Sequence, residues 1–204
     1  MIIRWAVKKL SLRNDREYRK FAEFEIRMMD DPNQMIVEGY ALTFDQPTVL
    51  FEMDGIQYKE MIGRGSLTNT DLTDVIFNYD HSGKVMARTR NNTLELTVDD
   101  RGLKIRARLD GTKEGQALYE EIKGGYVDRM SFAFMASSEE YNKETRTRTI
   151  TGIKKIYDVA AVSIPAYEST SISARSFFLA EAEKEQKALD SAELRKKLIM
   201  LTYV

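Results

Sequence analysis

The chain has no cysteine and a single histidine among its 204 residues. The lack of cysteine excludes disulfide bonds, thiolate metal sites and a cysteine nucleophile. With only one histidine as well, a metal ion could be held only by carboxylates, and the sequence shows no calcium-loop pattern. We therefore expect neither a metal nor another cofactor, and any general-base chemistry that uses histidine must use His81.

Long apolar runs and a strong net charge are also missing. No stretch approaches the roughly 18 apolar residues that read as a membrane-spanning helix. The first ten residues are too short in apolar length and too interrupted by charge to be a signal peptide. The formal net charge is −1, so the chain as a whole lacks the positive charge typical of nucleic-acid-binding proteins. We expect a cytoplasmic protein that requires neither a membrane nor nucleic acid.

The charged residues are concentrated at the two ends of the chain. Residues 1–20 carry seven basic and two acidic side chains, which favours a solvated basic leader, with an arm for an acidic partner or for nucleic acid as the alternative. Residues 178–200 combine many charges with a thin apolar stripe, as in an exposed helix. The sequence thus predicts a basic leader (1–20), one mostly β domain (21–170), and a linker followed by a charged C-terminal helix (171–204).

The middle of the chain has the patterns of β-strands. Asp54-Gly55 between two apolar runs is a strong hairpin signal, and residues 93–98 and 103–109 form a second predicted hairpin. One helix is expected over Lys113–Lys123, with Thr112 as its N-cap. The polar residues 137–143 are expected to form a loop. The fold class is therefore α+β and mainly β.

His81 follows an apolar run that begins at Val75, so we expect the ring at the end of a buried strand or in the loop after it. Histidine is the side chain whose ordinary pKa lies near neutrality, and it can take and return a proton at working pH. A single histidine is nevertheless more often a hydrogen-bonded structural residue than a catalyst.

Two further polar residues lie inside strand-like apolar runs. Ser131 is flanked by apolar residues on a predicted strand that would hold its hydroxyl rigidly, although serine is common in strands. Asp158 interrupts the last β-type run, where a carboxylate is costly to bury unless it is paired. A serine nucleophile needs an adjacent base, and a carboxylate can fix the tautomer of that base. From the residues alone, a serine hydrolase that uses Ser131, His81 and Asp158 is one hypothesis.

Four motifs in order resemble those of the tailed-phage (caudovirus) prohead, or capsid maturation, serine proteases. They are Val37–Phe44, Asn78–His81, Met130–Phe134 and Asp158–Tyr167. The resemblance extends over about residues 21–175. It implies a fold similar to that of the herpesvirus assemblins, which is a closed or partly closed β-barrel surrounded by a few helices.

The resemblance also implies roles for individual residues. It makes His81 the general base and Ser131 the nucleophile of a serine endopeptidase. Assemblins use a second histidine as the third residue, which this chain lacks, so Asp158 is expected there because of its place in order. The competing carboxylates are Glu120, Glu139 and Glu140, and Arg129 is a candidate for the oxyanion site.

The implied substrates are the major capsid protein with its scaffold segment and the protease itself, which is expected to be a homo-oligomer. The implied place is the assembling prohead in the host cytoplasm. Two other functions stay open. One is a non-catalytic β-barrel module that binds capsid or scaffold partners through its leader and helical tail. The other is a proton-transfer enzyme that uses Asp80 and His81 alone.

Overall fold

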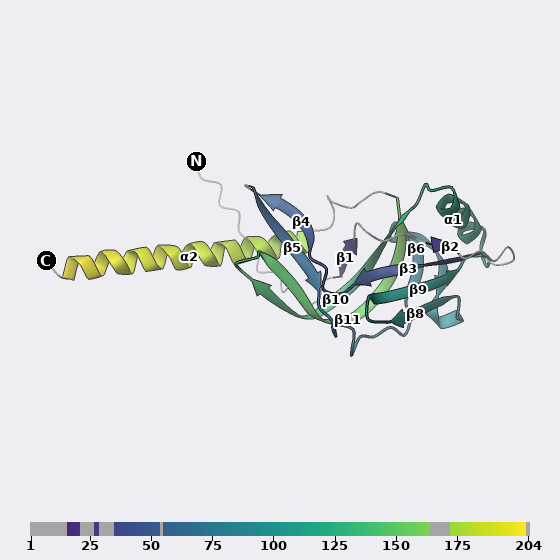
Figure 1. Ribbon diagram of the computed structural model, residues 1–204, viewed down its shortest axis with the longest axis horizontal. Coiled ribbons are helices and arrows are strands. Elements are labelled where there is room, and N and C mark those ends of the chain that lie inside the picture. The colour runs from purple at the N-terminus through teal and green to yellow at the C-terminus, as the bar shows by residue number, and fades with distance from the viewer. Residues whose placement is uncertain (1–15, 21–26, 29–34, 54, 164–171, 203–204) are drawn as a thin grey trace.

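The computed structural model describes residues 16–20, 27–28, 35–53, 55–163 and 172–202. Within these residues the chain forms eleven strands, two α-helices and one 3₁₀ turn, Thr89–Asn91 (Figure 1). The prediction of a mainly β protein with few helices is confirmed. No described helix has the length and apolar character needed to cross a membrane.

The larger sheet contains the strands that carry the polar residues singled out above. Its strand order is β1-β10-β11-β5-β4, and β6 pairs with both β11 and β7. The bounds are β1 Glu17–Lys20, β4 Thr48–Met53, β5 Ile56–Ile62, β6 Ile76–Tyr79, β7 Ser82–Arg88, β10 Arg129–Asn142 and β11 Thr147–Val162.

The smaller sheet has the order β2-β3-β9-β8. Its strands are β2 Arg27–Met28, β3 Ile36–Thr43, β8 Leu94–Val98 and β9 Gly102–Arg108. One apolar core contains buried side chains of both sheets, such as Leu42, Ile105, Phe132 and Val159. Among the described strands, the pairings leave two open sheets, and none of them closes a single barrel.

The long strand β11 organises the larger sheet because it has different partners along its length. One edge of β11 pairs with β10 in antiparallel fashion. The other edge pairs in parallel with β5 at residues 147–150 and with β6 at residues 158–161. As a result, the end of β6 lies beside the last residues of β11, close to β10, the strand that carries Ser131.

The two helices lie at opposite ends of the molecule (Figure 1). Helix α1, Lys113–Lys123, has the predicted bounds, and the Thr112 hydroxyl caps it by accepting from Gly115 N at 2.9 Å. Helix α2, Ile172–Thr202, extends away from the sheets. Its base is anchored by Phe178, which is 1% exposed and belongs to an apolar cluster with Leu50 and Tyr58.

Several boundaries differ from the sequence-based expectations. Residues 17–20, expected to belong to a basic leader, form β1, and α2 begins within the expected linker. The polar residues 137–142 continue β10 instead of forming a loop, because they pair with β11 in a two-stranded extension. Both predicted hairpins are confirmed as β4-β5 and β8-β9. Most of the expected leader (1–15) and residues 21–26, 29–34 and 164–171 lie outside the described residues.

Candidate active site

His81 occupies the tight turn between β6 and β7. Asp80 and His81 are its two central residues, with φ of 46° and 55°, and Tyr79 pairs with Ser82 across the hairpin. Two positive φ values in a two-residue loop match the type I′ turn, whose twist suits antiparallel strands. Asp and His are among the residues that tolerate this region best. The ring is therefore presented by a short turn instead of a long loop.

Asp80 fastens this turn to the end of β11. Its backbone N–H donates to Ala161 O at 2.9 Å. Its carboxylate accepts from the backbone N–H and the hydroxyl of Ser163, both at 3.2 Å. These bonds engage the Asp80 carboxylate with Ser163 at the end of β11.

Ser131 and Asp158 lie on the neighbouring strands β10 and β11. In the antiparallel register Ser131 is opposite Ala160, and Ala133 is opposite Asp158. Residues two apart on a strand point to the same face of the sheet. Ser131 and Asp158 therefore project on the same side, diagonally across the two strands, and the β6-β7 turn brings His81 to that side.

The three side chains form a continuous line of contacts. His81 Nδ1 lies 2.5 Å from Asp158 Oδ1, and His81 Nε2 lies 2.5 Å from Ser131 Oγ. The side chain of Asp158 is 2% exposed and that of His81 is 16% exposed, whereas the residue Ser131 is 4% exposed. A buried carboxylate that accepts from Nδ1–H leaves the Nε2 lone pair facing the serine hydroxyl. That is the geometry in which histidine can take the serine proton.

The competing carboxylates point elsewhere. Glu120 is exposed on α1, and Glu140 is exposed on the extension of β10. The Glu139 carboxylate accepts hydrogen bonds from the Arg148 guanidinium. Asp158 is therefore the candidate that the fold brings to the histidine.

Arg129 begins β10 two residues before Ser131. Its Nε lies 3.5 Å from the Asp128 carboxylate, and its side chain is 35% exposed. This contact does not test a role of Arg129 in oxyanion stabilisation, which stays a prediction.

The sequence reasoning missed a fourth element at the site, which is β1. Ser131 Oγ lies 2.8 Å from the Arg19 backbone oxygen. The Tyr18 ring contacts the His81 ring edge-on, with 4.8 Å between centroids, and Arg16 lies 3.7 Å from the Asp158 carboxylate. The sequence signal for β1 was the alternation of Glu17 and Arg19 with Tyr18. The many charges of the segment obscured this signal.

The inward side chains of β1 belong to a buried ionic network. Arg19 binds Glu60 and Glu17, and Arg148 binds Glu17, Glu60 and Glu139. Burial acts to lower the pKa of Arg19, but the Glu60 and Glu17 carboxylates outweigh it and raise that pKa above the ordinary value. Burial acts to raise the pKa of Glu17, but hydrogen bonds and charge from the two arginines lower it. Glu17 and Arg19 therefore both stay charged at neutral pH.

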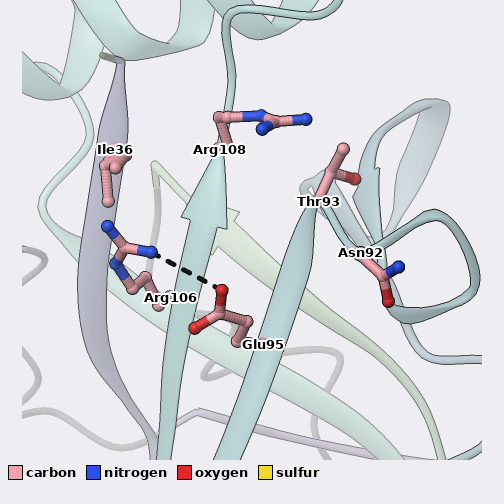
Figure 2. A pocket seen from close by; sticks show the side chains of 6 residues that line it. All are labelled: Ile36, Asn92, Thr93, Glu95, Arg106 and Arg108. Carbon is pink, nitrogen blue, oxygen red and sulfur yellow. Dashed lines mark ion pairs between the residues drawn. The ribbon is translucent and has the colours of Figure 1, made fainter.

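Other places for a ligand are separate from these residues. Among the described residues, no group of three or more His, Asp or Glu side chains is placed to hold a metal ion. A pocket of about 60 Å³ lies beside β8 and β9 on the smaller sheet, with the ion pair Arg106–Glu95 at 3.5 Å on its wall (Figure 2). The residues that line it are Ile36, Asn92, Thr93, Glu95, Arg106 and Arg108, so it does not contain the Asp158–His81–Ser131 line.

Comparison with known proteins shows that the chain is similar to two phage proteases. It is 27% identical to the prohead protease of Enterobacteria phage HK97 over 156 residues. That alignment covers 76% of this chain and 66% of the relative, so the chain spans slightly less than two thirds of that protein's length. The chain is also similar to the solved capsid assembly protease of bacteriophage T4, with 13% identity and a TM-score of 0.49 over 73% of this chain and 99% of the other.

The family comparison covers most of the sequence. Residues 22–185 match the family described as caudovirus prohead serine protease. The matched range includes the turn with His81, the strand with Ser131 and the strand with Asp158. The chain belongs to the caudovirus prohead serine protease family.

Proposed function

We propose that the protein is a serine endopeptidase whose catalytic residues are Ser131, His81 and Asp158. The observation that carries this proposal is the line of two 2.5 Å contacts from Asp158 Oδ1 through the His81 ring to Ser131 Oγ. Membership in a family of prohead serine proteases supports the same reaction.

The proposed reaction follows from these contacts. His81 Nε2 takes the Ser131 proton as Oγ attacks the carbonyl carbon of the scissile bond, and Asp158 stabilises the imidazolium through Nδ1–H. The imidazolium then gives its proton to the leaving amine, which breaks the C–N bond and leaves an acyl-enzyme. Water, deprotonated by His81, releases the new carboxylate and restores the serine. The burial of Asp158 strengthens its effect on the ring because little water screens the charge.

We propose that the substrates are the major capsid protein with its scaffold segment, together with the protease itself. The site of action would be the interior of the assembling prohead in the host cytoplasm, with the protease present as a homo-oligomer. The family description and the name of the HK97 relative both refer to the prohead, and they support this assignment.

We also propose that the two sheets, β1 included, represent a partly closed, assemblin-like barrel, with the exposed part of α2 as an appendage. The apolar core shared by both sheets and the exposed length of α2 support this division. An experimental structure in which the edges of the two sheets stay far apart all around the core would contradict the barrel.

The test of the proposed activity is co-expression with the phage capsid protein and its scaffold segment. The wild-type protein is expected to shorten the capsid protein, and Ser131→Ala is expected to leave it intact. Ser137→Ala changes an exposed serine of the same strand and serves as the matched control. If Ser131→Ala cleaves as well as the control, Ser131 is not the nucleophile. If no variant cleaves, the non-catalytic assembly module is favoured.

A further inference from the structure

Strand β1 is placed as a peptide substrate would be. On the basis of the proposed function, we propose that residues 16–20 are bound as the enzyme's own substrate, that Arg19–Lys20 is the self-cleavage bond, and that Glu60 and Arg148 select a Glu-x-Arg sequence.

The main chain of β1 extends the sheet at the strand that carries the nucleophile. β1 pairs antiparallel with β10, with Lys20 opposite Ser131 and Arg19 opposite Phe132. Among the described strands β1 is the outermost of this sheet, so β10 would become the edge if β1 left. An extended peptide commonly binds by adding a strand to such an edge, and its side chains then fill pockets at alternate positions.

The Arg19 carbonyl group lies at the nucleophile. Its oxygen is 2.8 Å from Ser131 Oγ, and because a C=O bond is about 1.2 Å long, the carbonyl carbon is within about 4.0 Å of Oγ. The serine hydroxyl carries one hydrogen, which it can donate either to Arg19 O or to His81 Nε2. When the hydrogen passes to His81, the oxygen lone pair is left next to the Arg19 carbonyl.

The Arg19 side chain occupies a buried acidic site. It is 1% exposed, and its Nε and Nη2 reach the two carboxylate oxygens of Glu60, which is 2% exposed. This paired contact uses the planar fork of arginine, which a lysine ammonium cannot reproduce. Glu60 comes from β5 and is 41 residues away in sequence. The site therefore has the features of a pocket selective for arginine before the scissile bond.

The second selected side chain is Glu17, two residues earlier on the same face of β1. Arg148 Nη1 lies 2.8 Å from Glu17 Oε2, and Arg148 Nη2 lies 3.0 Å from Glu17 Oε1. Arg148 also binds Glu60 and Glu139. If Glu17 and Arg19 leave together, Glu60 and Glu139 remain around Arg148 with a net charge of −1. A peptide with a glutamate and an arginine two residues apart leaves this net charge unchanged, but it returns the arginine fork to Glu60 and a second buried carboxylate to Arg148.

The chemical step balances without any further reactant than water. Ser131 Oγ forms a bond to the Arg19 carbonyl carbon while its proton moves to His81. The Arg19–Lys20 bond breaks, and the Lys20 nitrogen receives that proton to become the new amino terminus. Water then cleaves the Ser131 ester and leaves a carboxylate on Arg19.

The experiment is intact-mass analysis with amino-terminal sequencing of the purified full-length chain. Wild type is expected to yield a chain that begins at Lys20, at a rate independent of protein concentration because β1 belongs to the same molecule. Ser131→Ala is expected to stay intact. Arg19→Gln and Glu60→Gln are expected to slow cleavage by about 100-fold or more, because each removes a charge from a buried pair. Glu52→Gln, an exposed carboxylate on β4, is the matched control and is expected to cleave like wild type.

A charge exchange distinguishes a loss of selectivity from a loss of folding in the single variants. Arg19→Glu is expected to block cleavage, and adding Glu60→Arg is expected to restore it in part. Cleavage at Arg19–Lys20 at the wild-type rate in both Arg19→Gln and Glu60→Gln would overturn the proposed selectivity.

Labelling by a fluorophosphonate separates this inference from the proposed function. If Ser131 is labelled and the chain is cut only at other bonds, or not at all, the inference fails while the endopeptidase assignment stands. If Ser131 is not labelled and neither this chain nor the capsid protein is cut, both fail.

Discussion

Replacing Asp158 with asparagine tests how His81, the proposed general base, is held. The substitution keeps the size of the side chain but exchanges a carboxylate, which only accepts, for an amide that can donate to His81 Nδ1. The amide would favour the tautomer with hydrogen on Nε2, which points a donor at Ser131 instead of an acceptor. Asp158 is buried, so little water reaches its side chain to compensate for the lost carboxylate. Arg16 lies 3.7 Å from that carboxylate, and its own side chain is 41% exposed.

The expected loss of reaction rate is large because Ser131, the proposed nucleophile, loses His81 as its base. In a Ser-His-Asp arrangement the wrong tautomer lowers the rate by about 10³–10⁴-fold, equivalent to about 4–5 kcal/mol of transition-state stabilisation. The second-order rate of Ser131 modification by a fluorophosphonate measures this loss without knowledge of the peptide substrate. The deficit should shrink at high pH, where hydroxide can remove the serine proton in place of His81.

The matched control is Asp100→Asn, which changes a fully exposed carboxylate and should label at the wild-type rate. A folded Asp158→Asn variant that labels within about threefold of wild type would show that Asp158 does not hold the histidine tautomer, since a threefold change is well under 1 kcal/mol.

Three further predictions concern stability. Phe178→Ala should lower the free energy of unfolding by about 3–5 kcal/mol, or free α2 from the sheets, because Phe178 is a buried anchor; urea unfolding followed by circular dichroism measures this, and an unchanged midpoint would contradict it. Thr112→Ala should cost about 1 kcal/mol by removing the cap of α1, with Thr68→Ala on an exposed turn as its comparison. Glu17 has a pKa below its ordinary value of 4.5, so its contribution to stability is complete above that pH and is lost as the pH falls below it. In the Ser131→Ala background, which keeps β1 attached, the stability difference made by Glu17→Gln should therefore shrink in acid, and a difference that grows would contradict the proposed pairing.

The parts of the site that the sequence could indicate are those with a local signature. A polar residue inside an apolar β-type run is conspicuous, and Ser131 and Asp158 are both of this kind. The apolar run from Val75 likewise predicted that His81 lies just after a strand. What brings these residues together is the parallel pairing of β6 with β11, a contact across about 80 positions that no local pattern contains.

The missed elements depend on distant partners. β1 is short and highly charged, and its inward side chains are buried only because Glu60 and Arg148 neutralise them from β5 and β11. The polar end of β10 is a strand because it pairs with β11, although its side chains face solvent. Strand formation there is a consequence of pairing, and composition alone favoured a loop.

The most direct test of the central claim is to map the adduct of a fluorophosphonate on the intact protein. We expect one adduct per chain, located on Ser131, formed in wild type and strongly reduced in His81→Ala. An adduct on another residue, or labelling of Ser131 that does not depend on His81, would contradict it.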